Sequence, residues 1–373
     1  MVPVPLGVLT KASAPSIREF KMSEETTARR KDSHLDLCAS QEVEPAQNST
    51  LFECVHLVHC AMPELSLDEL DFTAELFGRR LKYPVVITGM TGGTDRAARV
   101  NRDLAALAEK YGLAFGVGSQ RAMAEDARRA STFQVRDVAP TALVLGNIGL
   151  RQAAVLGARG VRELGKAIGA DAMALHLNAG QELTQPEGDR DFRGGYATVS
   201  ELVRVLEDRL LVKETGCGVS PQVGRRLVEL GVRHIDVSGL GGTSWVRVEQ
   251  LRSSGIAASV GQEFSGWGIP TAAAVACVRK AVPGDVKLVA SGGIRGGLEL
   301  AKALALGADV GGLALPLFRA QQAGGFEAAE LALREVLQGL AQAMLLTGSR
   351  KVSDLRAGLR VITGQLKEWI AAL

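Results

Sequence analysis

Arg30, Lys31 and His34 bring two adjacent cations and an imidazole together near the start of the chain. Arginine offers a planar fork of donors and lysine a mobile point charge, so this group of side chains suits a diphosphate. A basic pair near a terminus is more often a solvated surface, so the interpretation depends on the rest of the chain. Gln181 and Glu182 open a polar, acidic loop, and one carboxylate with phosphate oxygens is the usual way of holding Mg²⁺. Glu182 is therefore the candidate metal ligand.

Glycine pairs at three places indicate a second kind of site. Gly241-Gly242, Gly292-Gly293 and Gly311-Gly312 can expose backbone N–H groups without obstruction by a side chain. In (β/α)₈ barrels the loops after strands seven and eight commonly bind phosphate, and we expect that function here. The alternative is that these glycines only allow tight turns.

Lys213 ends the apolar run 210–214, where an inward-facing ammonium is costly unless it meets an anion or an electron-rich ring. The alternative is that Lys213 pairs with Glu214 or extends from the strand end into solvent. We expect a role for Lys213 in ligand binding.

Other chemistries find no support in the sequence. Cys54, His56, His59 and Cys60 lack the CxxC spacing of a zinc site and fit a strand instead. Neither a G-x-S-x-G elbow nor a Walker loop is present. Cys217 has no histidine beside it in the sequence, so we expect it to pack rather than react.

Eight short apolar runs must position these residues, and they are nearly continuous in Val, Leu, Ile and Ala, which is typical of parallel strands covered on both faces. The runs are 84–89, 113–118, 142–147, 171–178, 210–214, 234–239, 286–291 and 309–315. Helical patterns lie between them at 96–111, 220–231, 271–282 and 298–307. We therefore predict a single (β/α)₈ TIM barrel. A doubly wound sheet, the alternative, favours a complete dinucleotide turn, and 116–121 lacks its third glycine.

Polar residues gather where these runs end, which is where a barrel carries its active site. Ser119 to Arg121 follow the second run, His176 and Asn178 end the fourth, and Ser291 to Arg295 follow the seventh. A purely structural barrel has no reason to place polar residues at one strand end after another. The pattern therefore indicates a site at the carboxyl ends of the strands.

The composition excludes several classes of protein. The 373 residues are 46% hydrophobic and 23% charged, and a net charge of +2 is too small to predict nucleic-acid binding. No run of 18 apolar residues predicts a membrane span. Five scattered cysteines, an odd number, suggest a reducing, cytoplasmic location. Residues 1–28 are expected to be a disordered N-terminal extension, and 29–373 the barrel domain.

Taken together, several motifs resemble the type 2 isopentenyl diphosphate isomerase family, which is flavin-dependent. They include RKDSHL (30–35), ITGMTGGT (87–94), HLNAGQELTQPEGDRDF (176–192), IDVSGLGGTSW (235–245) and ASGGIRGGLELAKALALGAD (290–309). The resemblance implies an FMN-binding barrel that interconverts isopentenyl and dimethylallyl diphosphates in isoprenoid biosynthesis. It also implies reduced flavin, Mg²⁺, NADPH as the reductant, and a homotetramer or homo-octamer.

The resemblance also implies roles for individual residues. The flavin is expected to contact Thr88, Gly89, Met90, Thr91, Ser119, Asn147, Lys213, Ser238 and Thr243, and its phosphate Gly292, Gly293, Arg295, Gly312 and Leu313. The substrate is expected to contact Arg30, Lys31, His34, Arg121, Asn178 and Gln181, with Glu182 binding Mg²⁺. Gln181 and His176 are the expected catalytic residues. Because an amide is no strong acid or base, hydrogen bonding or proton relay is the expected role of Gln181.

The chain departs from the pattern of this family at two places. Ala179-Gly180 stand where a proline usually follows, which should loosen the loop that carries Gln181 and Glu182. Leu240 stands where the family often has Arg or Ala. Two other functions are alternatives: an FMN-dependent oxidoreductase of the α-hydroxyacid oxidase or inosinate dehydrogenase type, and a non-catalytic flavin- or isoprenoid-binding protein. RKDSHL and QELTQPEGD favour a diphosphate with Mg²⁺, and hence the isomerase.

Overall fold

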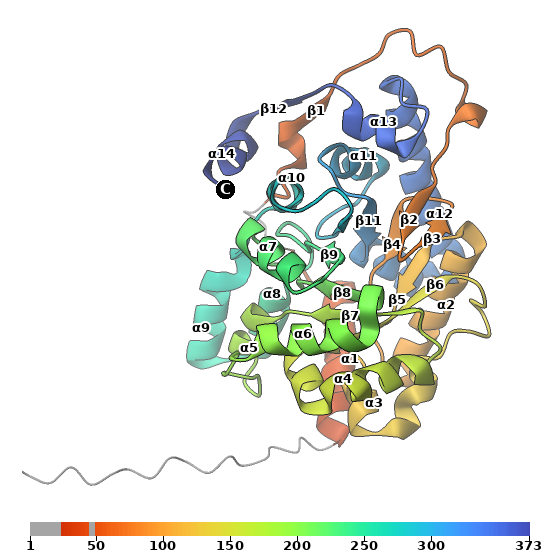
Figure 1. The fold of residues 1–373 in the computed structure, drawn as a ribbon. Coiled ribbons are helices and arrows are strands. Elements are labelled where there is room, and N and C mark those ends of the chain that lie inside the picture. Colours follow the sequence, from red (N-terminus) through yellow and green to blue (C-terminus); the bar gives the residue numbers. More distant parts are fainter. Residues whose placement is uncertain (1–23, 45–48) are drawn as a thin grey trace, which may run out of the picture.

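Eight parallel strands close into a barrel in the computed structural model, which describes residues 24–44 and 49–373 (Figure 1). The order around the barrel is β10-β11-β4-β5-β6-β7-β8-β9, so chain neighbours pair and β11 returns to β4. The strands are β4 (Val85–Ile87), β5 (Ala114–Gly116), β6 (Leu143–Gly149), β7 (Ala172–His176), β8 (Leu210–Lys213), β9 (His234–Asp236), β10 (Lys287–Ala290) and β11 (Val310–Leu313). Each lies within one of the predicted runs or extends two residues beyond it, and the predicted fold is confirmed.

Helices cover the outside of the barrel. They are α2 (Asp95–Tyr111), α4 (Leu150–Ala167), α6 (Gly195–Leu206), α7 (Pro221–Glu229), α10 (Thr271–Ala281), α11 (Gly297–Ala305) and α12 (Leu315–Leu346). Local signals set their starts, since Thr94 accepts a hydrogen bond from the N–H of Ala97 and Ser220 accepts one from that of Val223. Helix α12 has non-helical backbone at Gly324 and Gly325.

The hydrophobic core has two parts because strand side chains alternate between the two faces. Val85 and Ile87 of β4 pack outward beneath the helices, whereas Val86 points into the barrel. A hairpin formed by β2 (Ala74–Leu76) and β3 (Arg79–Leu81) adds Leu76 and Leu81 to this inner core. The hairpin closes the amino-terminal end, where the ring of Phe77 stacks on His234. The opposite end stays open for a site.

Helix α1 (Glu24–Ser40) lies outside the ring of barrel helices and packs against α12, α3 (Arg121–Glu125) and α8 (Trp245–Arg252). Its own side chains Leu35 and Cys38 are buried in this contact. The helix begins before the expected domain boundary at residue 29 because its later turns anchor it. Residues 1–23 of the expected extension lie outside the described residues.

Some elements near the chain ends were not predicted. Strand β1 (Val55–Leu57) pairs antiparallel with β12 (Arg360–Ile362), so segments far apart in the sequence lie side by side (Figure 1). Helices α13 (Val352–Ala357) and α14 (Gly364–Ala372) flank β12. The Cys54 to Cys60 segment contributes to this strand pair, as the sequence suggested, with His56 Nε2 3.1 Å from Thr363 Oγ1.

Candidate functional site

Two adjoining pockets lie at the carboxyl ends of the strands, and Gly89, Met90, Lys213, Thr215 and Trp245 line both. We call the first the cation pocket; its other lining residues are Arg30, Lys31, His34, Ser119, Arg121, Asn147, Gln152, His176, Asn178, Gln181, Glu182 and Gln185. We call the second the glycine pocket; its other lining residues are Glu44, Thr88, Gly216, Ser238, Gly242, Thr243, Ser291, Gly292, Gly293, Ile294, Arg295, Gly312, Ala314, Leu315 and Pro316.

Three cations converge on the cation pocket from two elements outside the strands. Helix α1 supplies Arg30 and Lys31, and the first residue of α3 supplies Arg121. Arg121 pairs with Glu125 at 2.9 Å, and Arg30 is 3.8 Å from Glu187. Burial, followed by the charges of Arg30 and Arg121, lowers the pKa of Lys31 to about 7. Such a concentration of positive charge favours an anionic ligand.

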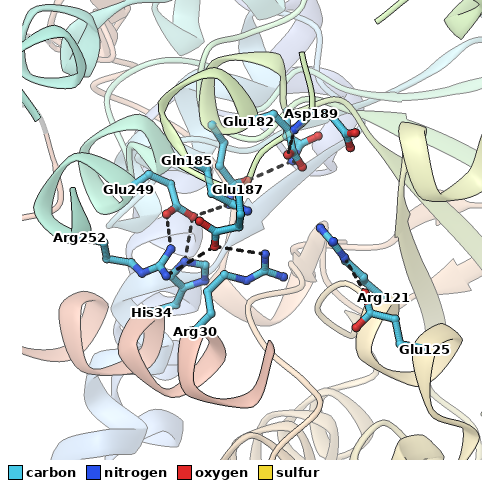
Figure 2. Close-up of polar contacts among 12 residues, drawn as sticks. Arg30, His34, Arg121, Glu125, Glu182, Gln185, Glu187, Asp189, Glu249 and Arg252 are labelled. Carbon is cyan, nitrogen blue, oxygen red and sulfur yellow. Dashed lines mark hydrogen bonds and ion pairs between the residues drawn. The ribbon is translucent and has the colours of Figure 1, made fainter. Parts of the chain in front are cut away.

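Glu249 of α8 is the centre of a buried hydrogen-bond network beside these cations (Figure 2). Its Oε1 accepts hydrogen bonds from His34 Nε2 at 2.9 Å and Gln181 Nε2 at 3.2 Å, and Oε2 accepts one from Arg252. Burial alone would raise the pKa of Glu249, but the bond from His34 and the charge of Arg252 hold it at about 2. The carboxylate therefore stays ionised and orients His34 and Gln181.

Glu182 is the one acidic side chain among the described residues that line the cation pocket. Asn178 Nδ2 donates to its Oε1 and the Asp189 N–H to its Oε2, both at 2.9 Å. A short helix, α5 (Ala179–Thr184), forms where a loosened loop was expected. Gln181 and Glu182 therefore lie on helical backbone. Two oxygens held in place beside a cluster of cations suit a metal ion that phosphate oxygens and waters complete.

The pocket wall opposite α1 carries His176, whose Nδ1 lies 2.7 Å from Asn147 Oδ1. Burial, followed by the charges of Lys213 and Lys31, lowers the pKa of His176 to about 3. The ring is therefore neutral at physiological pH. Lys213 itself donates a hydrogen bond to the carbonyl oxygen of Glu214, and its side chain lines both pockets.

The glycine pocket is shaped by backbone that approaches backbone. Gly292 and Gly293 have φ values of +104° and +84°, which only glycine adopts readily, and a Cβ on Gly293 would lie 2.4 Å from the carbonyl oxygen of Gly241. Arg295 donates to that same oxygen at 2.7 Å and pairs with Glu44 at 2.6 Å. This cradle of glycines with an arginine at its edge fits the phosphate of FMN.

The structure brings most of the expected site residues together. All eight residues expected for substrate, catalysis and metal line the cation pocket: Arg30, Lys31, His34, Arg121, His176, Asn178, Gln181 and Glu182. Ten of the expected cofactor residues line the glycine pocket: Thr88, Gly89, Met90, Lys213, Ser238, Thr243, Gly292, Gly293, Arg295 and Gly312.

The remaining cofactor candidates lie elsewhere. Ser119 and Asn147 face the cation pocket. Thr91 and Leu313 are buried and line neither pocket.

Sequence reasoning missed Glu249, Trp245 and Gln152. The ring of Trp245 meets that of His34 edge to face at 5.2 Å, and Gln152 stands near His176. No spacing in the sequence relates Glu249 to Gln181, so only the docking of α1 and α5 on α8 reveals it. The described residues form no group of three or more His, Cys, Asp or Glu able to hold a metal. Among the helices of residues 24–44 and 49–373, none is long and apolar enough to cross a membrane.

Known structures share the fold at low sequence identity. A mandelate oxidase mutant with a monooxide FMN adduct matches with a TM-score of 0.64 at 18% identity, covering 91% of this chain and 99% of that one. A Pediococcus acidilactici lactate oxidase matches with a TM-score of 0.64 at 15% identity, covering 91% and 93%. At this identity the likeness shows the fold alone. The model of the FMN-dependent dehydrogenase family matches residues 178–361.

Relatives with much higher identity carry one name. Isopentenyl-diphosphate delta-isomerase of Ignicoccus hospitalis is 43% identical over 92% of this chain and 96% of its own length. Those of Pyrococcus horikoshii and Methanosarcina mazei are each 42% identical, over 94% and 92% of this chain and 96% and 94% of their own. The chain therefore belongs to the FMN-dependent, type 2 isopentenyl-diphosphate delta-isomerase family.

Proposed function

We propose that this chain interconverts isopentenyl and dimethylallyl diphosphates, with FMN in the glycine pocket and the substrate in the cation pocket. The observation that carries the proposal is that the two pockets adjoin and share Gly89, Met90, Lys213, Thr215 and Trp245 as lining. A ligand held by its diphosphate in the cation pocket could extend its other end toward a cofactor bound in the glycine pocket. The isomerase names of the relatives support the same activity.

Arg30, Lys31 and Arg121 would bind the diphosphate, since they are the cations that converge on the cation pocket. Arg30 is 6% exposed, so the diphosphate would meet a guanidinium that is largely shielded from water. Charge-assisted hydrogen bonds in such a place are stronger than those at a surface. These contacts fix the position of the hydrocarbon end without touching it.

Glu182 would hold Mg²⁺ against the diphosphate, because its buried carboxylate faces the cation pocket and Asn178 fixes its orientation. Reduced FMN, when bound, would supply an electron-rich ring and a proton-carrying N5 close to the alkene. The glycine pocket fits that group through the cradle of Gly292 and Gly293, and Lys213, which lines the same pocket, would be available to contact it.

Moving the double bond by one position requires a proton to be added at one carbon and another removed from a neighbouring carbon, with no net redox change. Gln181 would contribute through its amide, which Glu249 orients by accepting a hydrogen bond from Nε2. His34 is held by the same carboxylate. These side chains would align the hydrocarbon end and exclude water, which protects a cation-like transition state.

The activity is tested by incubating the purified chain with FMN, Mg²⁺ and isopentenyl diphosphate, with and without dithionite, and measuring dimethylallyl diphosphate. We expect product only in the reduced samples, without stoichiometric consumption of the reductant. FMN-loaded protein that forms no product would contradict the proposal. Oxidation of a 2-hydroxy acid by the same protein would support an α-hydroxyacid oxidase instead.

A pair of lysine variants tests the assignment of the pockets. Lys31→Met removes a cation of the cation pocket, and we expect KM for the diphosphate to rise about 10- to 100-fold. FMN affinity should stay unchanged because Lys31 does not line the glycine pocket. Lys166→Met, which removes a surface lysine paired with Glu163, is the matched control and should leave both values unchanged.

Reduction by NADPH, assembly into a homotetramer or homo-octamer and a cytoplasmic location belong to the same proposal, with the family resemblance as their support. Replacing dithionite with NADPH in the assay tests the reductant, and light scattering of the purified protein tests the assembly. Activity with NADPH at catalytic turnover would support it as the reductant.

A further inference from the structure

His176 and Asn147 form a hydrogen-bonded pair on neighbouring strands, and the pair determines which nitrogen of the imidazole carries the proton. His176 ends β7, and β6 pairs with it so that Gly149 lies opposite His176. The Nδ1 of His176 is 2.7 Å from Oδ1 of Asn147. An imidazole nitrogen that faces an oxygen can only donate to it, provided that the amide is oriented as drawn.

The orientation of the Asn147 amide follows from its other contact. Its Nδ2 donates to the carbonyl oxygen of Val117 at 3.1 Å, and a carbonyl oxygen can only accept. The backbone of Asn147 is held on both sides, because its N–H donates to Gln120 Oε1 at 2.9 Å and its carbonyl accepts from the Gln120 N–H at 2.7 Å. The amide therefore presents Oδ1 to His176, and Nδ1 of the ring carries the proton.

The other ring nitrogen, Nε2, faces the cation pocket. It has no hydrogen-bond partner within residues 24–44 and 49–373. Lys31 of α1 and Lys213 of β8 are the charged groups that bear on the ring, and with burial they keep it neutral. A neutral ring with its proton on Nδ1 presents a lone pair at Nε2, and a lone pair repels a phosphate oxygen.

Residue 149 is a glycine, which lets the backbone at the end of β6 come close to the ring of His176. A Cβ on Gly149 would lie 2.9 Å from His176 Nε2 and 2.3 Å from Gln152 Oε1. The backbone there has φ −75°, which any residue adopts, so space rather than conformation requires the glycine. The ring of His176 therefore packs closely against the backbone at Gly149.

We propose that Asn147 is a positioning residue that fixes His176 as a hydrogen-bond acceptor toward the cation pocket. The group in front of Nε2 is then a donor, such as a water, and the diphosphate oxygens stay with Arg30, Lys31 and Arg121. His176, which the resemblance gives only as a catalytic residue, would then act as an acceptor at Nε2. The identity of the ligand rests on the proposed function, whereas the position of the proton does not.

The test is to read the tautomer directly by long-range ¹H–¹⁵N correlation in protein labelled at its five histidines, with His176→Gln to assign the signal. We expect the neutral Nδ1–H form at pH 7.5, both without ligand and after addition of inorganic diphosphate and Mg²⁺. An Nε2–H form or an imidazolium in either state would overturn the proposal. Because the measurement needs no turnover, an inactive protein that shows the Nδ1–H form would contradict the proposed function alone.

Two variants separate positioning from simple packing. Asn147→Leu keeps the size of the side chain but removes the acceptor, so protons should appear on Nε2. The turnover number should fall about tenfold or more with little change in KM, as when an orienting partner of a histidine is lost. Asn147→Asp restores an oxygen at the same place and should return the proton to Nδ1. An unchanged tautomer in Asn147→Leu would show that Asn147 only packs against the ring.

Discussion

At the scale of single residues, the two pockets differ in the charges that surround their cations. Lys31 faces Arg30 and Arg121, and its pKa falls to about 7. Arg295, on the other side of Lys213, is paired with Glu44 at 2.6 Å. The cation pocket thus concentrates positive charge, whereas the glycine pocket contains a carboxylate that would compete with an anionic ligand for Arg295. Each arrangement of charge should have a measurable effect on ligand binding.

Binding of a diphosphate to the cation pocket should take up a proton. A bound anion raises the pKa of Lys31 from about 7 toward its ordinary value, so the bound state is more protonated than the free state near pH 7.5. Affinity should accordingly fall as the pH rises from 7 to 9. Calorimetric titration with inorganic diphosphate in two buffers of different ionisation enthalpy measures the uptake. A binding enthalpy that is the same in both buffers would contradict this prediction. So would a proton uptake that Lys31→Met leaves unchanged.

Removal of the charge on Glu44 should strengthen FMN binding. Its carboxylate competes with the cofactor phosphate for Arg295, so Glu44→Gln should lower the Kd for FMN by about 3- to 10-fold at low salt. The gain should shrink as the ionic strength rises. Quenching of flavin fluorescence during titration of the flavin-free protein gives the Kd. Glu53→Gln, a carboxylate bonded to Ser49 rather than Arg295, is the matched control. Weaker binding in Glu44→Gln would show that Glu44 supports the cofactor instead.

At the scale of elements, the shape of the glycine pocket depends on the loops that follow the strands. The loop after β10 demonstrates this, because Gly292 and Gly293 both adopt positive φ and pass close to the backbone after β9. Side chains would push the two loops apart. The glycine pocket is therefore a property of two loops packed together rather than of any one residue.

A pair of glycine variants tests the packing of these loops. Gly293→Ala should abolish FMN binding, since its φ is +84° and its Cβ would lie 2.4 Å from the carbonyl oxygen of Gly241. Gly296→Ala is the matched control, because a Cβ there meets nothing within 4 Å. Because Gly296 is the N-cap of α11 and alanine is a poorer cap, this variant should cost about 0.5 to 1 kcal/mol of stability without loss of FMN binding. Equilibrium dialysis with FMN and thermal unfolding distinguish the two effects. Equal FMN affinity in both variants would rule out a tight contact between the loops.

The sequence predicts the elements well where a single short-range pattern determines them. The eight barrel strands are buried on both faces, so continuous apolar runs mark them clearly. The β1–β12 pair has three residues in each strand and joins segments about 300 residues apart, and no local pattern predicts it. Glu249 was missed for a related reason, because its partners His34 and Gln181 come from α1 and α5. Contacts between elements that are far apart in the sequence could not be predicted from the sequence alone.

At the scale of the whole molecule, buried histidines link stability to pH. Burial lowers the pKa of His176 to about 3 and that of His234 to about 4, and it lowers that of His34 as well. The unfolded chain binds these protons near pH 6.5, whereas the folded chain does not until the pH is much lower. Stability is therefore full above pH 6.5 and falls as the pH decreases toward 4. Asp236 and Glu214, whose pKa values burial raises, offset part of this loss.

Between about pH 6 and pH 5, the free energy of unfolding should fall with acid by about 1.4 kcal/mol per pH unit for His176 and by the same amount for His234. Urea unfolding of the flavin-free protein at pH 8, 6 and 5 measures the slope. His234→Gln keeps an acceptor for the N–H of Phe77 but removes the titrating ring, so its slope should be smaller by one histidine. A slope in His234→Gln equal to that of the unchanged protein would show that His234 does not titrate in this range.

The position of α1 determines which residues outside the barrel should influence substrate binding. Arg30, Lys31 and His34 stand on a helix that rests on α8 and α12, and Arg319 of α12 donates to the carbonyl oxygens of Cys38 and Gln41. The cations proposed to bind the diphosphate thus stand partly on a helix that is no part of the barrel. A closed barrel with α1 displaced would keep a place for flavin and lose the one for substrate. We therefore expect that substitutions of residues packed against α1 lower the activity even where those residues touch no ligand.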